Sequence, residues 1–312
     1  MNIVILGAAG FIGTNLVLAL AKNENNHVLA VDQNVMYFDS IERLKLNNVT
    51  CLAETFSVEM DFDKIIRNAD IVYHLVSTTF PTTSNQHISQ ELYSNVIFSA
   101  NLLEACVRCK ISKIVFISSG GTVYGKEVQC PLKEETSTYP ISSYGIQKIT
   151  IEKLLYLYNY LYGLDYRIIR LANPYGPYQR PNGKLGAVTT FTYKALKNEE
   201  ITIYGDGSVV RDFIYIDDAI KGILNIAFGE KDNRTFNLGS GRGISLNEVI
   251  QIVKSEVNPD LQVRYVEGRK VDVPVNFLNI ERYEKAYGNL NPINLKDGIG
   301  KTAAFLRQWY NI

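Results

Sequence analysis

A glycine turn close to the N-terminus constrains the fold of this 312-residue chain more than any other feature. Residues 1–6 form a short apolar run, as in a strand buried on both faces, and residues 14–22 follow with a helical pattern. Gly7, Gly10 and Gly13 lie between them. In a dinucleotide turn the first glycine turns the chain, the second lets backbone N–H groups approach a pyrophosphate, and the third lets the helix pack on the strand. The spacing predicts a site of this kind.

A carboxylate stands where such a site needs one. The apolar run 28–31 predicts a second strand, and Asp32 follows it at the distance from the turn where an acid reaches the two ribose hydroxyls. Its charge would repel a 2′-phosphate, which favours NAD over NADP as the cofactor. A merely tight strand–helix turn is the structural alternative.

Composition argues against several functional classes. Lys and Arg number 32, as do Asp and Glu, so no overall field recruits nucleic acid or an anionic membrane. The apolar stretch 3–21 follows no Lys or Arg and is interrupted by Thr14 and Asn15, so we expect neither a signal peptide nor a membrane span. Four cysteines, among them the C-x-x-C of Cys106 and Cys109, do not form a disulfide framework, and three histidines lack ligand spacing. We therefore expect a reduced, cytoplasmic protein without a metal site.

Apolar runs alternate with helical patterns through the first half of the chain, which is typical of a parallel sheet covered on both faces. We predict an α/β fold, a Rossmann-type doubly wound parallel sheet with a smaller, interleaved C-terminal α/β lobe for the substrate. Residues 1–172 form the NAD-binding domain, which also receives roughly 205–228, and residues 173–312 form most of the discontinuous second lobe. We expect a strand and helix over 212–228 to return to the main sheet, and residues 235–238 to belong to the smaller lobe.

Tyr144 and Lys148 are the candidate catalytic pair. A spacing of four residues within the helical pattern 141–161 places them on one face of a helix. A tyrosine titrates near pH 10, and a cation beside it favours the phenolate, so Tyr144 could act as a general base near neutral pH. A surface pair is the alternative. The preceding strand, which ends in the Ser-Ser-Gly-Gly of residues 118–121 downstream of a dinucleotide turn, favours catalysis.

With these features in order, the chain resembles the extended short-chain dehydrogenase/reductases of the nucleotide-sugar epimerase/dehydratase family almost from end to end. The shared motifs are highly specific for the family and less specific for the reaction. Beyond the glycine turn and Asp32, they comprise Asn95, residues 118–125, Tyr144 with Lys148, and residues 170–177, 205–207, 211–213, 215–219 and 237–241.

The resemblance implies roles for the residues around the predicted active site. Tyr144 would be the catalytic base, and Lys148 would hold the nicotinamide ribose and depress the pKa of the tyrosine. The family's epimerases also carry a Ser or Thr that binds the reacting hydroxyl, but Gly120 stands at that position here. Ser119, Thr122 or a water molecule would supply the missing group.

The resemblance also argues against one reaction and implies a cofactor-binding set. The family's 4,6-dehydratases carry an acidic pair where this chain has Gly121 and Thr122, so dehydration is disfavoured. The positions that would bind NAD are Gly7, Gly10, Phe11, Ile12, Gly13, Asp32, Leu75, Asn95, Ser118, Tyr144 and Lys148.

Two arginines of the second lobe match family positions that bind the diphosphate of a nucleotide sugar, since a guanidinium fork suits phosphate oxygens. These are Arg211 and Arg269. Asn173 matches a further substrate contact, and Asp272 matches a carboxylate that organises the arginine region and the ribose. Arg180 is a weaker candidate outside this set.

The residue at position 276 bears on the choice of sugar. Hexose epimerases can carry a large Tyr four residues after the aspartate matched by Asp272, which leaves little room for an N-acetyl group. This chain has Asn276 there, and the hypothesis is that its pocket accepts 2-acetamido sugars as well as plain hexoses. An ordinary loop residue is the alternative.

The resemblance therefore implies an NAD-dependent 4-epimerase of a nucleotide-diphosphate sugar, UDP-hexose or UDP-N-acetylhexosamine, that works through a transient 4-keto intermediate. A nucleotide-4-keto-sugar reductase or dehydrogenase of deoxysugar biosynthesis and a non-catalytic NAD-binding regulator are the alternatives. The helices expected over 91–109 and 141–161 resemble those of a dimer interface in relatives, so we expect a homodimer. The sequence leaves the nucleotide, the sugar and the pathway open, with galactose metabolism and surface polysaccharide biosynthesis among the possibilities.

Overall fold

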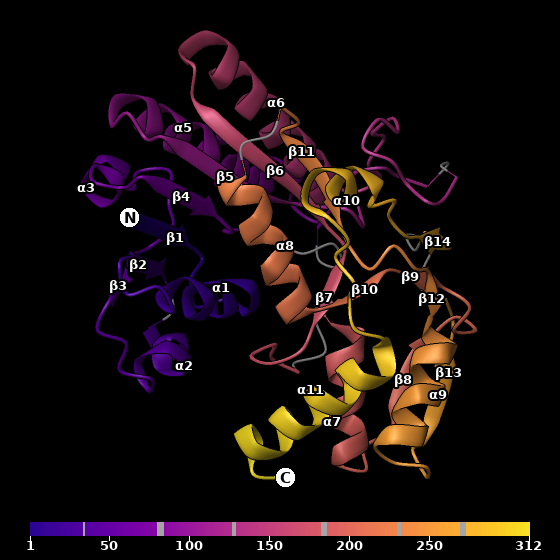
Figure 1. Ribbon diagram of the computed structural model, residues 1–312. Helices are drawn as coiled ribbons and strands as arrows, with labels where there is room; N and C mark the ends of the chain where they lie inside the picture. The colour runs from indigo at the N-terminus through magenta and orange to yellow at the C-terminus, as the bar shows by residue number, and fades with distance from the viewer. Residues whose placement is uncertain (34, 80–83, 127–128, 182–185, 230–231, 269–272) are drawn as a thin grey trace.

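A parallel sheet is the frame of the molecule. The computed structural model describes residues 1–33, 35–79, 84–126, 129–181, 186–229, 232–268 and 273–312. Seven strands, paired in parallel throughout, lie in the order β11-β6-β5-β4-β1-β2-β3 (Figure 1). Their bounds are β1 (Asn2–Leu6), β2 (His27–Asp32), β3 (Val49–Ala53), β4 (Ile71–His74), β5 (Lys113–Ser119), β6 (Asp165–Leu171) and β11 (Thr235–Leu238). The predicted α/β fold is thereby confirmed.

Helices cover both faces of this sheet because alternate strand residues point to opposite sides. In β1, Ile3 and Ile5 join one hydrophobic cluster, and Val4 and Leu6 join another. The first cluster is covered by α1 (Phe11–Ala21) and α8 (Ile216–Phe228), which lie together in front of the sheet in Figure 1. The second is covered by α3 (Phe62–Ile66), α5 (Phe98–Arg108) and α6 (Ser143–Tyr162). The short η1 (Val35–Phe38) and α2 (Asp39–Glu42) follow β2.

The long helix expected over 91–109 is three consecutive pieces. It begins with α4 (Ile88–Leu92), continues as a π-helical turn, η2 (Tyr93–Ile97), and ends with α5. Asn95 lies in the π-helical turn, where its Nδ2 donates to Thr78 Oγ1 at 2.7 Å and its Oδ1 accepts from Thr78 N at 2.9 Å. Asn95 therefore fixes the chain segment that follows β4. This segment lies at the carboxyl edge of the sheet, where parallel-sheet enzymes bind ligands.

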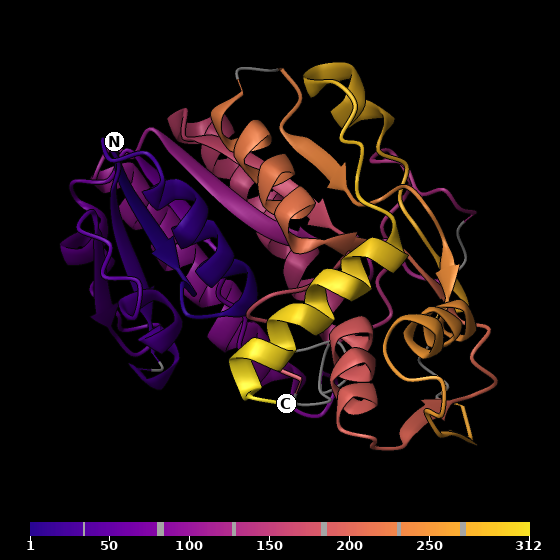
Figure 2. The same ribbon diagram turned by 60° about the horizontal axis from the view of Figure 1, so that its bottom comes forward.

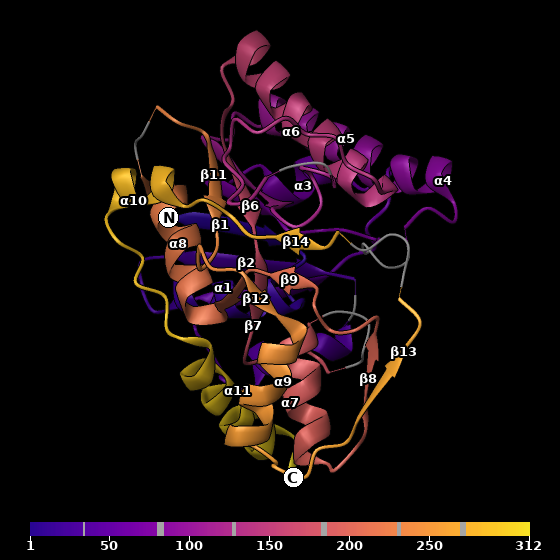
Figure 3. The same ribbon diagram turned by 90° about the vertical axis from the view of Figure 1, so that its right-hand side faces the viewer.

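The second lobe consists of short sheets and helices beyond the carboxyl ends of the main strands. Figure 3 shows α7 (Ala187–Leu196), α9 (Leu246–Glu256) and α11 (Leu295–Tyr310) gathered on one side of it. Figure 2 shows α11, in yellow, crossing the junction between the two lobes. The remaining elements are β7 (Asn173–Tyr175), β8 (Ile201–Tyr204), β9 (Val210–Arg211), β10 (Phe213–Tyr215), β12 (Ile244–Ser245), β13 (Val263–Val266), β14 (Val275–Asn276) and α10 (Glu281–Tyr287).

Two expectations about the later strands were wrong. The strand within 212–228 does not join the main sheet, because β10 pairs with β7 in a separate two-stranded sheet. Only α8, the helix of this segment, packs with the main sheet. The strand assigned to the smaller lobe, β11, is instead the edge strand beside β6, with Phe236 and Leu238 fully buried. The division of the chain into lobes near residue 172 remains a prediction.

Within the described ranges, no helix combines the length and apolar character needed to cross a membrane.

Candidate functional site

The glycine turn has the geometry of a dinucleotide cradle. Gly7 has a φ of +90°, a region that favours glycine, and its N–H donates to Val31 O at 2.9 Å. A Cβ on Gly13 would lie 2.2 Å from Gly7 O, so a side chain there would force the helix off the strand. Gly10 is the N-cap residue of α1, and no side chain in the described structure caps it. Its first turn, with Phe11 and Ile12, presents backbone N–H groups that suit a pyrophosphate.

Two further predicted cofactor residues adjoin the turn. The buried Asp32 ends β2, and its Oδ2 accepts a hydrogen bond from Ala9 N at 3.0 Å. Leu75 follows β4, and a Cβ on Gly7 would lie 3.2 Å from its carbonyl carbon. The turn, the acid and the end of β4 therefore meet at one place, and the cradle fits the NAD that the sequence predicts.

The candidate catalytic pair lies at the end of β5, at the same edge of the sheet as this cradle. α6 begins after Ser142, whose hydroxyl accepts from Gly145 N at 3.2 Å. Lys148 is buried, its Nζ donates to Ile117 O at 2.9 Å, and the same atom lies 5.5 Å from the centre of the Tyr144 ring. The hydrogen bond to the end of β5 thus holds the Lys148 ammonium group on the same face of α6 as the Tyr144 ring.

A hydroxyl is hydrogen-bonded to the candidate base. Ser119, the last residue of β5, is the hydrogen-bond partner of the Tyr144 phenol. Thr122 Oγ1 is buried and has no partner among the described residues. A Cβ on Gly120 would lie 2.6 Å from Leu278 Cδ1, and Leu278 is fully buried. Packing against Leu278 thus accounts for the glycine at the position where the family resemblance implies Ser or Thr.

The polypeptide by itself does not depress the pKa of Tyr144. Although the side chain is partly accessible, its hydroxyl lies deep in the fold, and burial raises the pKa to about 12, while the Ser119 hydrogen bond lowers it. Burial lowers the pKa of Lys148 to about 8, against the opposing effect of the Glu152 carboxylate. In the polypeptide without its cofactor, desolvation therefore dominates the pKa of Tyr144, and the lowering of this pKa by Lys148 together with the cationic nicotinamide stays a prediction.

A buried polar network that the sequence did not predict lies behind this pair. Glu152 accepts from Ser118 Oγ at 2.5 Å and pairs with Arg170 at 2.7 Å. Arg170 also donates to Tyr124 OH, which donates to Asn237 Oδ1 at 2.6 Å. Ser118 was predicted to contact the cofactor, but its hydroxyl donates a hydrogen bond to Glu152 inside the protein. The sequence feature that could have indicated this network is Glu152, a charged residue one helical turn after Lys148.

The substrate-lobe predictions are only partly placed. Asn173 donates through its backbone N and its Nδ2 to Asp212 O, at 3.0 and 2.9 Å. Arg211 lies in β9 and donates to Val273 O at 2.7 Å. Asn276 is buried in β14, with its Nδ2 3.4 Å from Gly121 O in the catalytic segment. Arg269 and Asp272 lie outside the described residues.

Asp212 is a hub that sequence reasoning missed. Its fully buried carboxylate accepts from Ser240 N and Oγ, at 2.7 and 2.6 Å. It also accepts from Gly241 N and Leu278 N, both at 3.2 Å. Burial raises its pKa although these donors lower it. One side chain therefore ties together the strand before β10, the loop after β11 and the segment after β14.

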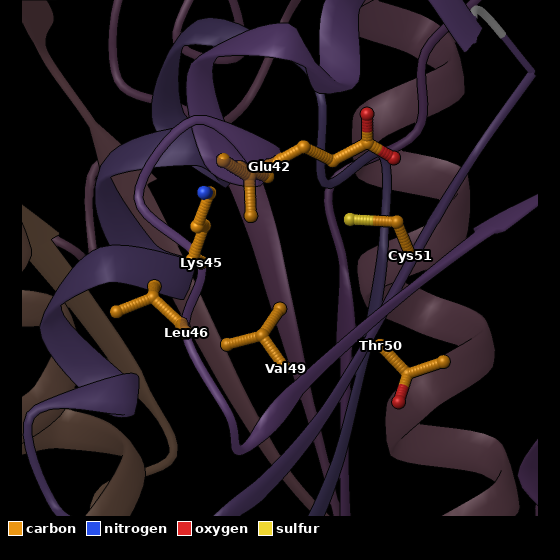
Figure 4. Close-up of a pocket in the computed structure, with 7 residues that line it drawn as sticks. Glu42, Lys45, Leu46, Val49, Thr50 and Cys51 are labelled. Carbon is orange, nitrogen blue, oxygen red and sulfur yellow. The ribbon is translucent and has the colours of Figure 1, made fainter.

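A shallow pocket between α2 and β3 has no part in this site. Its lining residues, most of them labelled in Figure 4, are Ile41, Glu42, Lys45, Leu46, Val49, Thr50 and Cys51. Burial, aided by the charge of Glu42, raises the pKa of Cys51 to about 11, so its thiol stays protonated and unreactive at neutral pH. Within the described ranges, no group of three His, Cys, Asp or Glu residues could hold a metal ion.

A parallel sheet with a glycine turn at its ligand-binding edge, and a Tyr–Lys pair on the helix beside it, define a dinucleotide-dependent enzyme of the short-chain dehydrogenase/reductase class. The model of the NAD dependent epimerase/dehydratase family matches residues 3–239, and the chain belongs to this family. NAD is its cofactor.

Relatives match over nearly the whole chain. A putative UDP-glucose 4-epimerase of Methanocaldococcus jannaschii is 34% identical over 310 residues, covering 98% of each protein. The structure of a UDP-glucose 4-epimerase of Thermotoga maritima with UDP-glucose is 32% identical, with a TM-score of 0.90 over 99% of this chain and 100% of the other. A UDP-N-acetylglucosamine 4-epimerase of Methanobrevibacter ruminantium, in complex with UDP-N-acetylmuramic acid, is 28% identical, with a TM-score of 0.91 over 99% and 98%.

Proposed function

We infer that this chain is an NAD-dependent nucleotide-sugar 4-epimerase that acts on a UDP-linked sugar. The observation that carries the inference is the meeting of Tyr144, Ser119 and Lys148 at the end of β5, beside the glycine cradle. The activities named for similar proteins support the reaction and the nucleotide.

In the proposed mechanism the chain holds the cofactor through three contacts. The turn from Gly7 to Gly13 binds the pyrophosphate, Asp32 binds the adenosine ribose, and Lys148 binds the nicotinamide ribose. When bound, the nicotinamide supplies a reversible hydride acceptor and a positive charge. Because burial raises the pKa of Tyr144 to about 12 in the polypeptide alone, such a charge favours the phenolate that the reaction needs.

Tyr144 moves the proton in this mechanism. Its phenolate takes the proton of the sugar 4-hydroxyl as C4 is oxidised, and returns it after the 4-keto sugar has turned and been reduced from its other face. The Ser119 hydroxyl holds the sugar oxygen, and Thr122 is a second candidate because its buried Oγ1 has no partner among the described residues. Asn173 and Arg211 would contact the diphosphate, and the roles of Arg269 and Asp272, which lie outside the described residues, stay those that the sequence predicts. No net oxidation occurs.

The reaction is tested with UDP-Glc, UDP-Gal, UDP-GlcNAc and UDP-GalNAc, each incubated with the purified protein without added cofactor. The C4 epimer of at least one is expected on chromatography. No conversion of any of the four, even with added NAD, would contradict the proposal. Consumption of NADH with a 4-keto sugar nucleotide would then identify the reductase alternative, and bound NAD without either reaction would identify the regulator.

The position of Asn276 supports a pocket that takes 2-acetamido sugars. Its side chain reaches Gly121 O, so a larger residue there would project into the catalytic segment. Asn276→Tyr is expected to lower kcat/KM for UDP-GlcNAc relative to UDP-Glc by roughly tenfold or more, since pocket size discriminates on this scale. Asn279→Tyr, three residues on, is the control. An unchanged ratio in Asn276→Tyr would show that the residue does not set the sugar preference.

A homodimer is proposed on the evidence of exposed apolar side chains along α6. Tyr156, Leu157, Tyr160 and Leu161 repeat at helical spacing, and Tyr160 is 76% exposed. α4, which packs near the start of α6, carries a further exposed apolar residue, Ile88. Light scattering is expected to give the mass of two chains. Tyr160→Asp should halve it, whereas Lys153→Asp, on the same helix, should not; a monomeric parent protein would remove the proposal.

The cell compartment and pathway also stay proposals. We propose a cytoplasmic enzyme of galactose or surface-polysaccharide metabolism. The four free cysteines suit a reducing compartment. Fractionation of cells that produce the protein would test the location.

A further inference from the structure

The loop after β7 leaves the substrate lobe and runs to the glycine turn. It is held from two sides. Asn15 of α1 donates through Nδ2 to Pro177 O at 3.0 Å. Tyr178, whose φ is +67°, packs its ring edge-on against Phe305 at 4.9 Å and Trp309 at 5.5 Å, both in α11. A non-glycine residue in this backbone region needs such support, so the path of the loop is well determined.

This path carries Arg180 to the cofactor cradle. Arg180 Nη2 donates to Ala9 O at 2.9 Å, and its guanidinium carbon lies 3.2 Å from the centre of the Tyr37 ring. Ala9 is therefore bound on both sides, since its N–H donates to Asp32. A residue from the second lobe thus fixes the central peptide of the turn that receives the pyrophosphate.

The surroundings of Arg180 explain why it remains there. Burial lowers the pKa of its guanidinium, while the charge of Asp32 and the phenols of Tyr37 and Tyr310 raise it. A half-buried cation is stabilised only when such partners offset its lost hydration. The carboxylate that would bind the adenosine ribose is one of them. Arg180 is consequently part of the electrostatic environment of the cofactor as well as a link between lobes.

We propose that Arg180 is a cofactor-retaining residue, which locks the Ala9 peptide of the glycine turn from the substrate-lobe side and so slows the release of NAD. The inference rests on the NAD site of the proposed function but not on which sugar is converted. A purely structural link between lobes would stabilise the fold without affecting how long NAD stays bound.

The test compares NAD retention in Arg180→Met, Arg180→Lys and a matched control, Arg43→Met. Methionine keeps the apolar stem, and lysine keeps the charge but loses the planar fork. Arg43 also stacks on an aromatic ring, that of Trp309 at 5.4 Å, but it forms an ion pair with Asp39 and not a contact with the glycine turn. The readouts are the NAD released per chain on denaturation and the rate at which bound NADH fluorescence is lost on chasing with NAD.

Arg180→Met is expected to release the cofactor roughly 10- to 100-fold faster, as for one hydrogen bond from a charged group. Arg180→Lys should fall between it and the parent, and Arg43→Met should match the parent. Equal release rates in Arg180→Met and the parent, or equal acceleration in Arg43→Met, would overturn the proposal.

A drop in the unfolding temperature of the NAD-stripped Arg180 variants, with an unchanged rate of NAD release, would show that Arg180 is a structural link only. If Arg180→Met does not fold, the NAD release rate of Arg180→Lys is compared with that of the parent instead, and equal rates would overturn the proposal. None of these readouts requires sugar turnover, so they stand even if the epimerase assay fails.

Discussion

Replacing Tyr144 with Phe is expected to abolish 4-epimerisation while leaving the fold and the bound NAD intact. The substitution removes only the phenol oxygen that is hydrogen-bonded to Ser119, and the ring keeps its place near the Lys148 ammonium. Without that oxygen no group at this position can take the proton from the sugar 4-hydroxyl. The rate should fall by at least ~10²-fold, since a positioned general base contributes about 10²–10⁴-fold. Initial rates with the preferred UDP-sugar measure it.

Tyr156→Phe provides the control for this variant. Tyr156 lies on the same helix, three turns beyond Tyr144, and is exposed. Its loss of a hydroxyl should leave the rate unchanged. The NAD content of both variants should equal that of the parent. If Tyr144→Phe kept more than about a tenth of the parent rate, well above the loss expected for a general base, another group would be the base.

Replacing Asp212 with Ala is expected to cause the largest loss of stability. Four hydrogen-bond donors, from Ser240, Gly241 and Leu278, would lose their acceptor in a fully buried position. Each buried donor left unsatisfied costs about 1–3 kcal/mol, so the free energy of unfolding should fall by at least about 3 kcal/mol. Urea denaturation followed by circular dichroism measures this change.

Asp206→Ala is the matched control for that experiment. Asp206 also accepts two hydrogen bonds, from the backbone N and the hydroxyl of Ser208, but it is exposed. Water can replace those bonds, so its loss should leave the free energy of unfolding nearly unchanged. Similar losses in the two variants would show that the Asp212 contacts do not hold these chain segments together.

The sequence predicted the cofactor half of the site better than the substrate half, for a physical reason. The glycine turn and Asp32 are set by local backbone geometry, and local geometry is readable from residue spacing. The Tyr144–Lys148 distance follows from helical periodicity in the same way. Arg211 lies instead in the two-residue strand β9, whose pairing with β12 and β14 depends on tertiary contacts, and Arg269 and Asp272 lie outside the described residues.

The errors in the fold and the site have the same origin. A four-residue run such as Thr235–Leu238 predicts a strand, but its residues do not indicate which sheet the strand joins. The raised pKa of Tyr144 depends on burial by residues distant in the chain, which spacing does not reveal. The glycine at position 120 is explained by contacts with Leu278, more than half the chain away, and with the backbone of Arg170. The role of Asp212 was not predicted for the same reason, because the donors to its carboxylate come from two segments distant in the chain.

The pairing of β11 with β6 limits where this chain can be divided without damaging the main sheet. A fragment that ended near residue 172 would leave the edge of β6 exposed, because Ile168 N and Ala172 N donate to Arg234 O and Leu238 O. It would also lose α8, which covers one face of the sheet. An unpaired apolar edge promotes aggregation. The part of the chain before residue 172 therefore cannot be exchanged between proteins as a separate module, because β11 and α8 complete its sheet.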